Sequence, residues 1–186
     1  MKTKVAGLDL AALERNCCGY AVIDLELSRL VGLKCLYEDE EIVASILTDN
    51  VKVVSVDSPI AREPRLRAVD RAAMKLGFRV LPPNLGYMSK LTIRGWNLYE
   101  RLTSVGVIVI ETHPRSALKS SKAGSVVDLA RRLGVDLGEY ESRRLRKDLR
   151  DAIVAALVSL CYVRGDCVSQ IVAEDGAIYL IKPLFQ

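Results

Sequence analysis

The stretch VAGLDLAALERNCCGYAVIDL, residues 5–25, contains two apolar runs separated by a short polar segment. The runs from Val5 to Leu10 and from Cys17 to Leu25 have the composition of buried strands. Because the segment between them is too short for a crossover helix, we expect the two strands to pair antiparallel. Gly19 lies inside the second run, where a missing side chain permits close packing. A third run, Leu30 to Leu36, completes a predicted antiparallel meander.

Helices and strands are predicted to alternate along the rest of the chain. Helical patterns occur at residues 38–47, 62–75, 90–102, 126–133 and 143–163. Strand patterns occur at 51–57, at 105–110 before Pro114, and in two short runs around Asp175-Gly176 that indicate a hairpin. This order predicts an α/β fold with a mixed sheet flanked by helices, in which an antiparallel β-β-β meander precedes helix-connected parallel strands. No linker divides the chain, so residues 1–186 are expected to form one domain.

The composition is that of a globular protein, with 50% hydrophobic and 27% charged residues. The longest apolar run, residues 152–163, is too short to span a membrane. Residues 1–60 carry 6 basic and 10 acidic side chains, whereas residues 61–186 carry 21 and 13. This asymmetry predicts a basic surface that faces nucleic acid, although an ordinary solvated surface is the alternative.

The five cysteines form an odd set, without a CxxC pair and without a secretory signal before them. Adjacent Cys17 and Cys18 would point to opposite faces of a strand, which disfavours a metal chelate. We expect these two, with Cys35, Cys161 and Cys167, to be reduced and buried in a protein of a reducing compartment. The predicted location is therefore cytoplasmic.

Acidic residues fall where three predicted buried strands end, at Asp9, Asp57 and Glu111. Ligands of α/β sheets bind at this edge, and charged side chains seldom end buried strands unless they are paired or bind metal. Asp148 and Asp151 are three residues apart, which places them on one face of the last helix. Clustered carboxylates are compensated by divalent metal, and two such ions about 3.5–4 Å apart can promote phosphoryl displacement. These five carboxylates are the candidate catalytic residues.

Each carboxylate also has an ordinary structural interpretation. Asp9 and Asp57 could each form a turn, and Glu111 could pair with a neighbouring arginine. The two helical carboxylates could form salt bridges with Arg144, Lys147 or Arg150. The joint occurrence of acidic groups at three strand ends and on one helix favours the metal site.

Five segments, read together and in order, resemble a predicted-nuclease family of RNase H-like fold, filed as domain of unknown function 429. They are VAGLDLAA (5–12), VVSVDSPI (53–60), RAVDRAAMKLG (67–77), VIVIETHPRSAL (107–118) and KDLRDAIVAAL (147–157). The last segment also resembles the final helix of RuvC-type Holliday-junction resolvases. The resemblance runs from residue 5 to about residue 180. It implies an RNase H-like fold and a nuclease that depends on Mg²⁺ or Mn²⁺.

By position in these motifs, Asp9 resembles the first-strand aspartate that bridges two metal ions in RNase H-like nucleases. Asp57 resembles the acidic residue that ends the fourth strand, and Asp148 and Asp151 resemble the acidic positions of the last helix. The resemblance thus implies a site for two ions held by Asp9, Asp57 and Asp151. Glu111 matches the family's own Glu-x-x-Pro motif. Residues 10–12 lack the glycine that resolvases usually have there, a difference that concerns the substrate more than the fold.

Two basic segments are expected near the same sheet edge and are the candidate nucleic-acid contacts. They contain Arg62, Arg65, Arg67 and Arg71, and Arg143, Arg144, Arg146 and Lys147. Basic side chains beside the carboxylates would hold the phosphates of DNA or RNA, including branched forms. Alternatively, they pair with acidic neighbours such as Asp70, Glu63, Glu139 and Glu141 on a solvated face.

His113 is the only histidine, and it could either carry protons near a scissile phosphate or have a structural role. Residues 81–89 form a proline- and glycine-containing loop of the kind that covers binding sites. Within or after it, Tyr87 and Trp96 could stack on bases, although core packing is the alternative for Trp96.

The sequence therefore predicts a nuclease that hydrolyses phosphodiesters of structured nucleic acid by a two-metal mechanism. A nucleic-acid-binding protein without turnover is the first alternative. A nucleotide phosphohydrolase of the actin-like type is the second, but residues 10–16 contain no glycine for a phosphate loop. The expected partner is nucleic acid rather than a membrane, and the resemblance to resolvases implies a homodimer.

Overall fold

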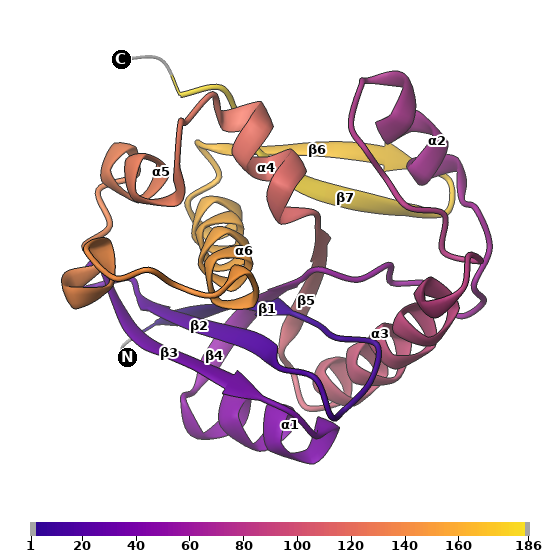
Figure 1. Cartoon of the computed structure of the whole chain (residues 1–186), viewed down its shortest axis with the longest axis horizontal. Coiled ribbons are helices and arrows are strands. Elements are labelled where there is room, and N and C mark those ends of the chain that lie inside the picture. Colours follow the sequence, from indigo (N-terminus) through magenta and orange to yellow (C-terminus); the bar gives the residue numbers. More distant parts are fainter. Residues whose placement is uncertain (1–2, 185–186) are drawn as a thin grey trace.

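Figure 1 shows the computed structural model, which describes residues 3–184. Seven strands form one sheet in the order β3-β2-β1-β4-β5-β7-β6. The strands are β1 Lys4–Asp9, β2 Cys18–Asp24, β3 Arg29–Leu36, β4 Val51–Val56, β5 Ile108–Thr112, β6 Val168–Ala173 and β7 Gly176–Ile181. The helices are α1 Asp39–Thr48, α2 Ala68–Lys75, α3 Tyr87–Ser104, α4 Pro114–Ser121, α5 Val126–Arg132, the 3₁₀ helix η1 Gly138–Glu141, and α6 Lys147–Arg164.

The strand pairing confirms the predicted mixed sheet. β1, β2 and β3 form an antiparallel meander. β4 pairs parallel with β1, and β5 pairs parallel with β4 and β7. The predicted terminal hairpin is β6 and β7, which pair antiparallel around Asp175-Gly176. Three adjacent parallel strands, β1, β4 and β5, therefore end at one edge in the middle of the sheet.

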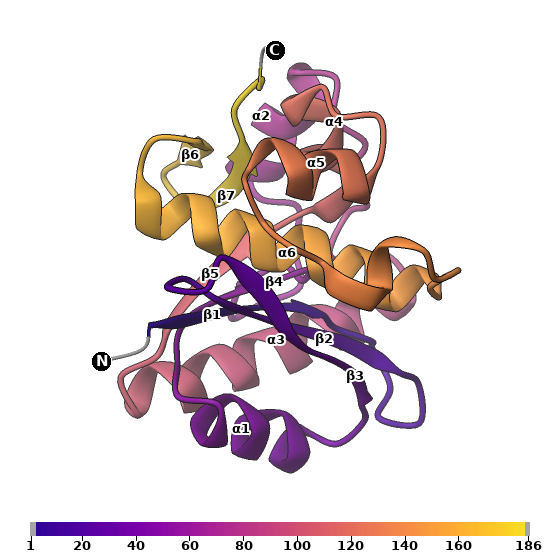
Figure 2. The same cartoon turned by 90° about the vertical axis from the view of Figure 1, so that its left-hand side faces the viewer.

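Helix α6 lies on one face of the sheet, and α1 and α3 lie on the other (Figure 2). Residues 152–161 of α6 are buried on all sides, which explains their continuous apolar sequence. A Cβ atom at Gly7 would overlap the backbone of Ala152 and Ala156, and one at Gly19 would overlap the backbone of Asp148. The two glycines thus let α6 lie directly on β1 and β2, with its first turn near the strand ends. None of the helices within residues 3–184 has the length and apolarity needed to cross a membrane.

Two helices begin well after their predicted starts, and α4 is a helix that the sequence patterns did not predict. Residues 62–67 are not helical, and α2 begins only at Ala68, after Pro64. α6 begins at Lys147 rather than at residue 143. Pro114 does not only follow a strand: it is the first residue of α4, a position that suits proline because its missing N–H has no partner there.

The cysteines correct the prediction of five reduced thiols. Cys17 is bonded to Cys35, with 5.1 Å between their Cα atoms, and Cys161 to Cys167, with 5.0 Å. The first pair forms because Cys17 precedes β2 and Cys35 lies opposite Gly19 on β3. The second forms because Gly165, in the left-handed conformation, turns the chain back after α6. Cys18 remains a free, buried thiol, and the cysteines no longer support a reducing compartment.

Candidate active site

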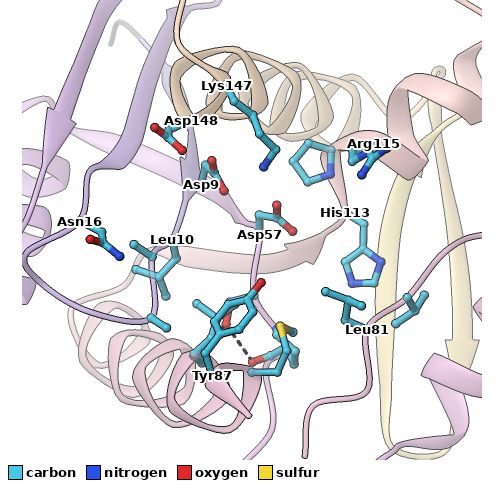
Figure 3. A pocket seen from close by; sticks show the side chains of 18 of the residues that line it. Asp9, Leu10, Asn16, Asp57, Leu81, Tyr87, His113, Arg115, Lys147 and Asp148 are labelled. Atoms are coloured by element: carbon cyan, nitrogen blue, oxygen red, sulfur yellow. Dashed lines mark hydrogen bonds between the residues drawn. The ribbon is translucent and has the colours of Figure 1, made fainter. Parts of the chain in front are cut away.

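A cleft of about 1130 Å³ opens at the carboxyl ends of the central parallel strands, and both Asp9 and Asp57 line it. Asp9 is the last residue of β1, and Asp57 directly follows β4. The Asp57 backbone N–H donates to the Leu8 carbonyl at 2.8 Å, which keeps the two strand ends level. Figure 3 shows the two carboxylates side by side on the cleft floor.

The first turn of α6 places further charged groups above this floor. Lys147 and Asp148 line the cleft, and Figure 3 shows the Lys147 side chain extending toward Asp9 and Asp57. The Lys147 ammonium lies 3.0 Å from Oδ2 of Asp151, one turn further along the helix. The alternative in which Asp151 forms a salt bridge within its helix is therefore observed, with Lys147 as the partner.

The acidic groups act strongly on one another. Burial raises the pKa of Asp9 to about 8, and the charges of Asp57 and Asp151 add to the rise. Burial also raises the pKa of Asp57 to about 6, where the charge of His113 opposes the rise and that of Asp151 adds to it. The hydrogen bond to Asp151, together with the charges of Asp9 and Asp57, raises the pKa of Lys147. Three carboxylates and one ammonium thus form one electrostatic unit.

The donor chemistry of this unit suits a divalent cation. The carboxylates of Asp9, Asp57 and Asp151 are hard oxygen ligands, and a cation would relieve the repulsion that contributes to the raised pKa of Asp9. In the part of the chain from residue 3 to 184, no group of three or more His, Cys, Asp or Glu side chains is arranged to hold a metal ion. The ammonium of Lys147 lies among the carboxylates instead, so coordination of an ion requires side-chain movement.

Glu111 is buried in β5 and bonded to protein donors through both oxygens. Oε1 accepts a hydrogen bond from Arg67 at 2.6 Å, and Oε2 accepts from Arg67 and from the Ile60 N–H, both at 2.7 Å. Arg67 also donates to both oxygens of Asp70, at 2.7 and 3.0 Å. The alternative in which Glu111 pairs with an arginine is therefore observed. Because both oxygens are bonded to protein donors, Glu111 positions neighbouring groups beside the cleft.

Arg67 corrects one predicted nucleic-acid contact. Its side chain is only 2% exposed, and its guanidinium lies between the two carboxylates of Asp70 and Glu111. A buried guanidinium that is paired on two sides has no surface left for a phosphate. Sequence alone could not separate Arg67 from its arginine neighbours, because Glu111 is 44 residues away along the chain.

His113 joins this buried network to the cleft. Its Nε2 lies 3.6 Å from Oε1 of Glu111, an ion-pair distance rather than that of a short hydrogen bond, and its side chain is 16% exposed. Burial would lower the pKa of His113, but its interaction with Glu111 and the charge of Asp57 raise it above the ordinary value. Glu111 itself has a lowered pKa, because Arg67 and His113 outweigh the effect of its burial. His113 lines the cleft, so its imidazole is held next to the acidic floor.

The other predicted basic contacts are divided among three places. Arg146 and Lys147 line the cleft. Arg62 and Arg65 line a second cavity of about 340 Å³ beside Trp96. Arg71, Arg143 and Arg144 are exposed outside both cavities, and Arg143 pairs with Glu139 at 2.6 Å, as the alternative predicted.

Four basic residues in the cleft had not been singled out from the sequence, namely Arg15, Arg79, Arg115 and Lys119. They belong to three separate segments. Arg115 lies within the quoted segment 107–118, where it had been given no role, and no spacing along the chain relates it to Arg15 or Arg79. The predicted binding segment 81–89 does contribute, because Leu81, Tyr87 and Met88 line the same cleft. Tyr87 and Met88, however, belong to the first turn of α3 rather than to a loop. Trp96 instead packs against Tyr99, with 5.2 Å between the ring centroids.

Comparisons with known proteins bear on the fold. No family model matches the chain, and no curated protein sequence matches it. The resemblance to the predicted-nuclease family therefore receives no support from these comparisons. Among solved structures, Thermus thermophilus RuvC in complex with a Holliday junction substrate matches with a TM-score of 0.57 and 16% identity, over 88% of this chain and 96% of that chain. Another structure of T. thermophilus RuvC matches with a TM-score of 0.56 and 15% identity, over 87% and 96%.

These similarities and the sheet order define the class of the protein as an α/β protein of RNase H-like fold. Within that class, its structural neighbours are RuvC resolvases. At 16% identity the likeness concerns the fold alone.

Proposed function

We propose that this protein is a metal-dependent nuclease that hydrolyses phosphodiesters in structured nucleic acid, with branched junctions as the first substrates to test. One observation carries the proposal: Asp9 and Asp57 lie side by side on the floor of a large cleft that basic residues also line. The RuvC neighbour solved with a Holliday junction supports the choice of substrate.

Asp9, Asp57 and Asp151 are the residues that would hold divalent cations, Mg²⁺ or Mn²⁺, and the proposal includes two ions. Bound there, such ions would supply an activated water and stabilise the charge of the reacting phosphate. Asp148 lies on the same turn of α6 as Lys147 and is the fourth acidic group of the proposed site.

The remaining side chains have separate roles in this proposal. Arg146 and Lys147 neutralise phosphates at the start of α6, where both line the cleft. Glu111, itself held by Arg67, keeps His113 at the cleft floor. From this position the imidazole can hold or release a proton close to the reacting phosphate.

Cleavage assays with labelled four-way junction, duplex and single-stranded substrates, as DNA and as RNA, test the proposal. We expect cleavage by the wild-type protein with Mn²⁺ or Mg²⁺ and none with EDTA. Asp9→Asn and Asp57→Asn should each abolish it, because each removes a charged ligand from the floor. The matched control is Glu174→Gln, an exposed carboxylate outside the cleft, which should cleave like wild type. Absence of cleavage for every substrate, or equal cleavage by Asp9→Asn, would contradict the proposal.

A nucleic-acid-binding protein without turnover is the second candidate, and the position of Lys147 favours it. An ammonium 3.0 Å from Asp151 neutralises part of the acidic cluster without any metal. In that case the protein binds the same substrates, Mn²⁺ produces no cleavage, and calorimetry detects no Mn²⁺ binding that Asp9→Asn removes.

A further inference from the structure

One wall of the cleft is built from two segments that lie far apart in the sequence. Residues 77–81 form one part, and the first two turns of α4 form the other. Lys119 joins them: its ammonium donates to the Gly77 carbonyl at 3.0 Å and lies 5.9 Å from the centroid of the Phe78 ring. The loop that precedes α3 is thereby held against α4.

Two cations on this wall have no acidic partner. Arg79 and Arg115 are exposed and line the cleft, yet neither forms an ion pair with any residue between 3 and 184. Arg132 of the next helix, in contrast, pairs with Asp128 at 3.0 Å, one helical turn away. The first turn of α4, which contains Arg115, also has no acidic residue. Unpaired guanidinium groups in a concave surface fit an anionic ligand, and arginine matches the geometry of phosphate.

The cleft extends to both sides of the acidic floor. Figure 3 shows Arg115 on the Asp57 side of the floor and Asn16 on the Asp9 side. Arg15, the neighbour of Asn16, also lines the cleft. A strand, whose phosphates continue in both directions from the one at the floor, fits a cleft of this extent better than a mononucleotide does.

We propose that Arg79 and Arg115 bind backbone phosphates of a nucleic-acid strand that crosses the cleft, and that Lys119 positions Arg79 for this contact. This inference rests on the proposed function. It adds Arg79 and Lys119, which lie outside the quoted motifs, and it gives a role to Arg115, which lies within the segment 107–118. Arg79 and Arg115 contact phosphate directly, whereas Lys119 acts through the loop of residues 77–81.

Fluorescence anisotropy with labelled duplex and single-stranded oligonucleotides, measured from low to high salt, tests the wall. All proteins carry Asp9→Asn, which prevents cleavage and lowers repulsion of the phosphates. Arg79→Ala with Arg115→Ala should reduce the log–log salt slope by about 1.8 on a duplex and about 1.4 on a single strand, since two contacts are lost. The control pair Lys52→Ala with Arg131→Ala removes the same charge from exposed residues outside the cleft and should leave the slope unchanged.

Lys119 requires a test that separates positioning from general stability. Added to the Asp9→Asn parent, Lys119→Met should lower the salt slope by up to about 0.9. Added to a protein that already carries Arg79→Ala, it should not change the slope. Lys119→Arg, which keeps a donor for the Gly77 carbonyl, should restore the slope. Melting temperatures of all variants report whether any of them is simply unfolded.

Each result decides between the two proposals. If the cleft double variant and the control double variant weaken binding equally, the cations act only through net charge, and the proposed phosphate contacts of Arg79 and Arg115 are wrong. If the parent protein binds no oligonucleotide at low salt, both the wall and the proposed function fail. If only the cleft double variant lowers the salt slope and the wild-type protein never cleaves, Arg79 and Arg115 bind phosphates as proposed, and the nuclease proposal fails.

Discussion

Lys147 and the carboxylates of Asp9, Asp57 and Asp151 form a group in which one ammonium faces three acidic side chains. Because Lys147 is 63% exposed, its ion pair with Asp151 is screened by water and contributes little to stability. Burial, with the neighbouring acidic charges, raises the pKa values of Asp9 and Asp57, so both groups take up protons more readily than exposed carboxylates. The free energy of unfolding of the protein without metal is therefore expected to depend on pH.

In EDTA, the free energy of unfolding is expected to fall as the pH rises from about 5 to 8. The folded-state pKa of Asp9 is raised from 3.8 to about 8, so its stabilising protonated form is lost through this window. Asp57 and His113, whose pKa values are also raised, act in the same direction. Asp9→Asn should flatten the decline and abolish stabilisation by Mn²⁺. Denaturant titrations at pH 5 and 8 in EDTA measure the decline, and the same titrations with Mn²⁺ measure the stabilisation by metal. A decline that is equally steep in Asp9→Asn would assign it to other groups.

Arg67 is expected to be among the most sensitive positions for stability. Arg67→Met leaves Asp70 and Glu111 buried without their common cation, and removal of one partner of a buried pair costs about 3–5 kcal/mol. Arg143→Met is the matched control, because its pair with Glu139 is about 60% exposed and is expected to contribute about 0–1 kcal/mol. Urea denaturation measures the difference; similar losses in both variants would show that the buried network does not stabilise the fold.

At the scale of elements, the sequence patterns predicted the strands well and the helix starts less well. β1 to β4 and the terminal hairpin were recognisable because buried strands need apolar runs of fitting length. The start of α2 was placed six residues too early because arginine and alanine are compatible with both loop and helix. A tertiary contact marks the start of α2. The carboxylate of Asp175, at the β6–β7 turn, accepts hydrogen bonds from the N–H groups of Ala68 and Val69 at 2.6 and 3.1 Å. No local pattern contains that contact.

The two disulfides are expected to stabilise different elements by different amounts. In the chain-entropy estimate, the Cys17–Cys35 bond closes the longer loop, with a sequence separation of 18, and contributes about 3 kcal/mol. The Cys161–Cys167 bond has a separation of 6, and the same estimate gives about 2 kcal/mol. Paired Cys→Ser variants, compared by thermal unfolding with and without reductant, test this order. Two variants that melt alike, or a wild-type protein that reductant leaves unchanged, would contradict it.

For the whole molecule, the acidic floor could be predicted from the sequence and the basic wall could not. Asp9 and Asp57 follow apolar strands whose parallel order places their ends together, so a local pattern combined with a topological rule locates them. Arg79 and Arg115 line the same cleft only because a loop and a helix from different parts of the chain form one wall. The five cysteines show the same limit, since the Cys17–Cys35 pairing depends on the register of β2 against β3.

In the proposed complex, an acidic floor beside a basic wall implies that divalent metal and nucleic acid bind cooperatively. Without metal, the carboxylates of Asp9 and Asp57 would repel the phosphate nearest the floor, while Arg79 and Arg115 would attract its neighbours. A bound cation would remove the repulsion, so Mn²⁺ should tighten the binding of a strand, measured at low temperature and before any cleavage. Coupling free energies of typical size correspond to about 5- to 150-fold, and by linkage the strand must tighten Mn²⁺ binding by the same factor.

Two titrations on one protein test this coupling: strand affinity with and without Mn²⁺, and Mn²⁺ affinity with and without the strand. Asp9→Asn should bind the strand equally well in both conditions, because the repulsion and the ion are removed together. Arg79→Ala with Arg115→Ala should bind more weakly throughout and keep the coupling factor, because these residues lie on the wall rather than on the floor. A strand affinity that Mn²⁺ leaves unchanged in the wild-type protein would mean that the floor and the nucleic acid do not meet, and the phosphates would have to be bound elsewhere on the molecule.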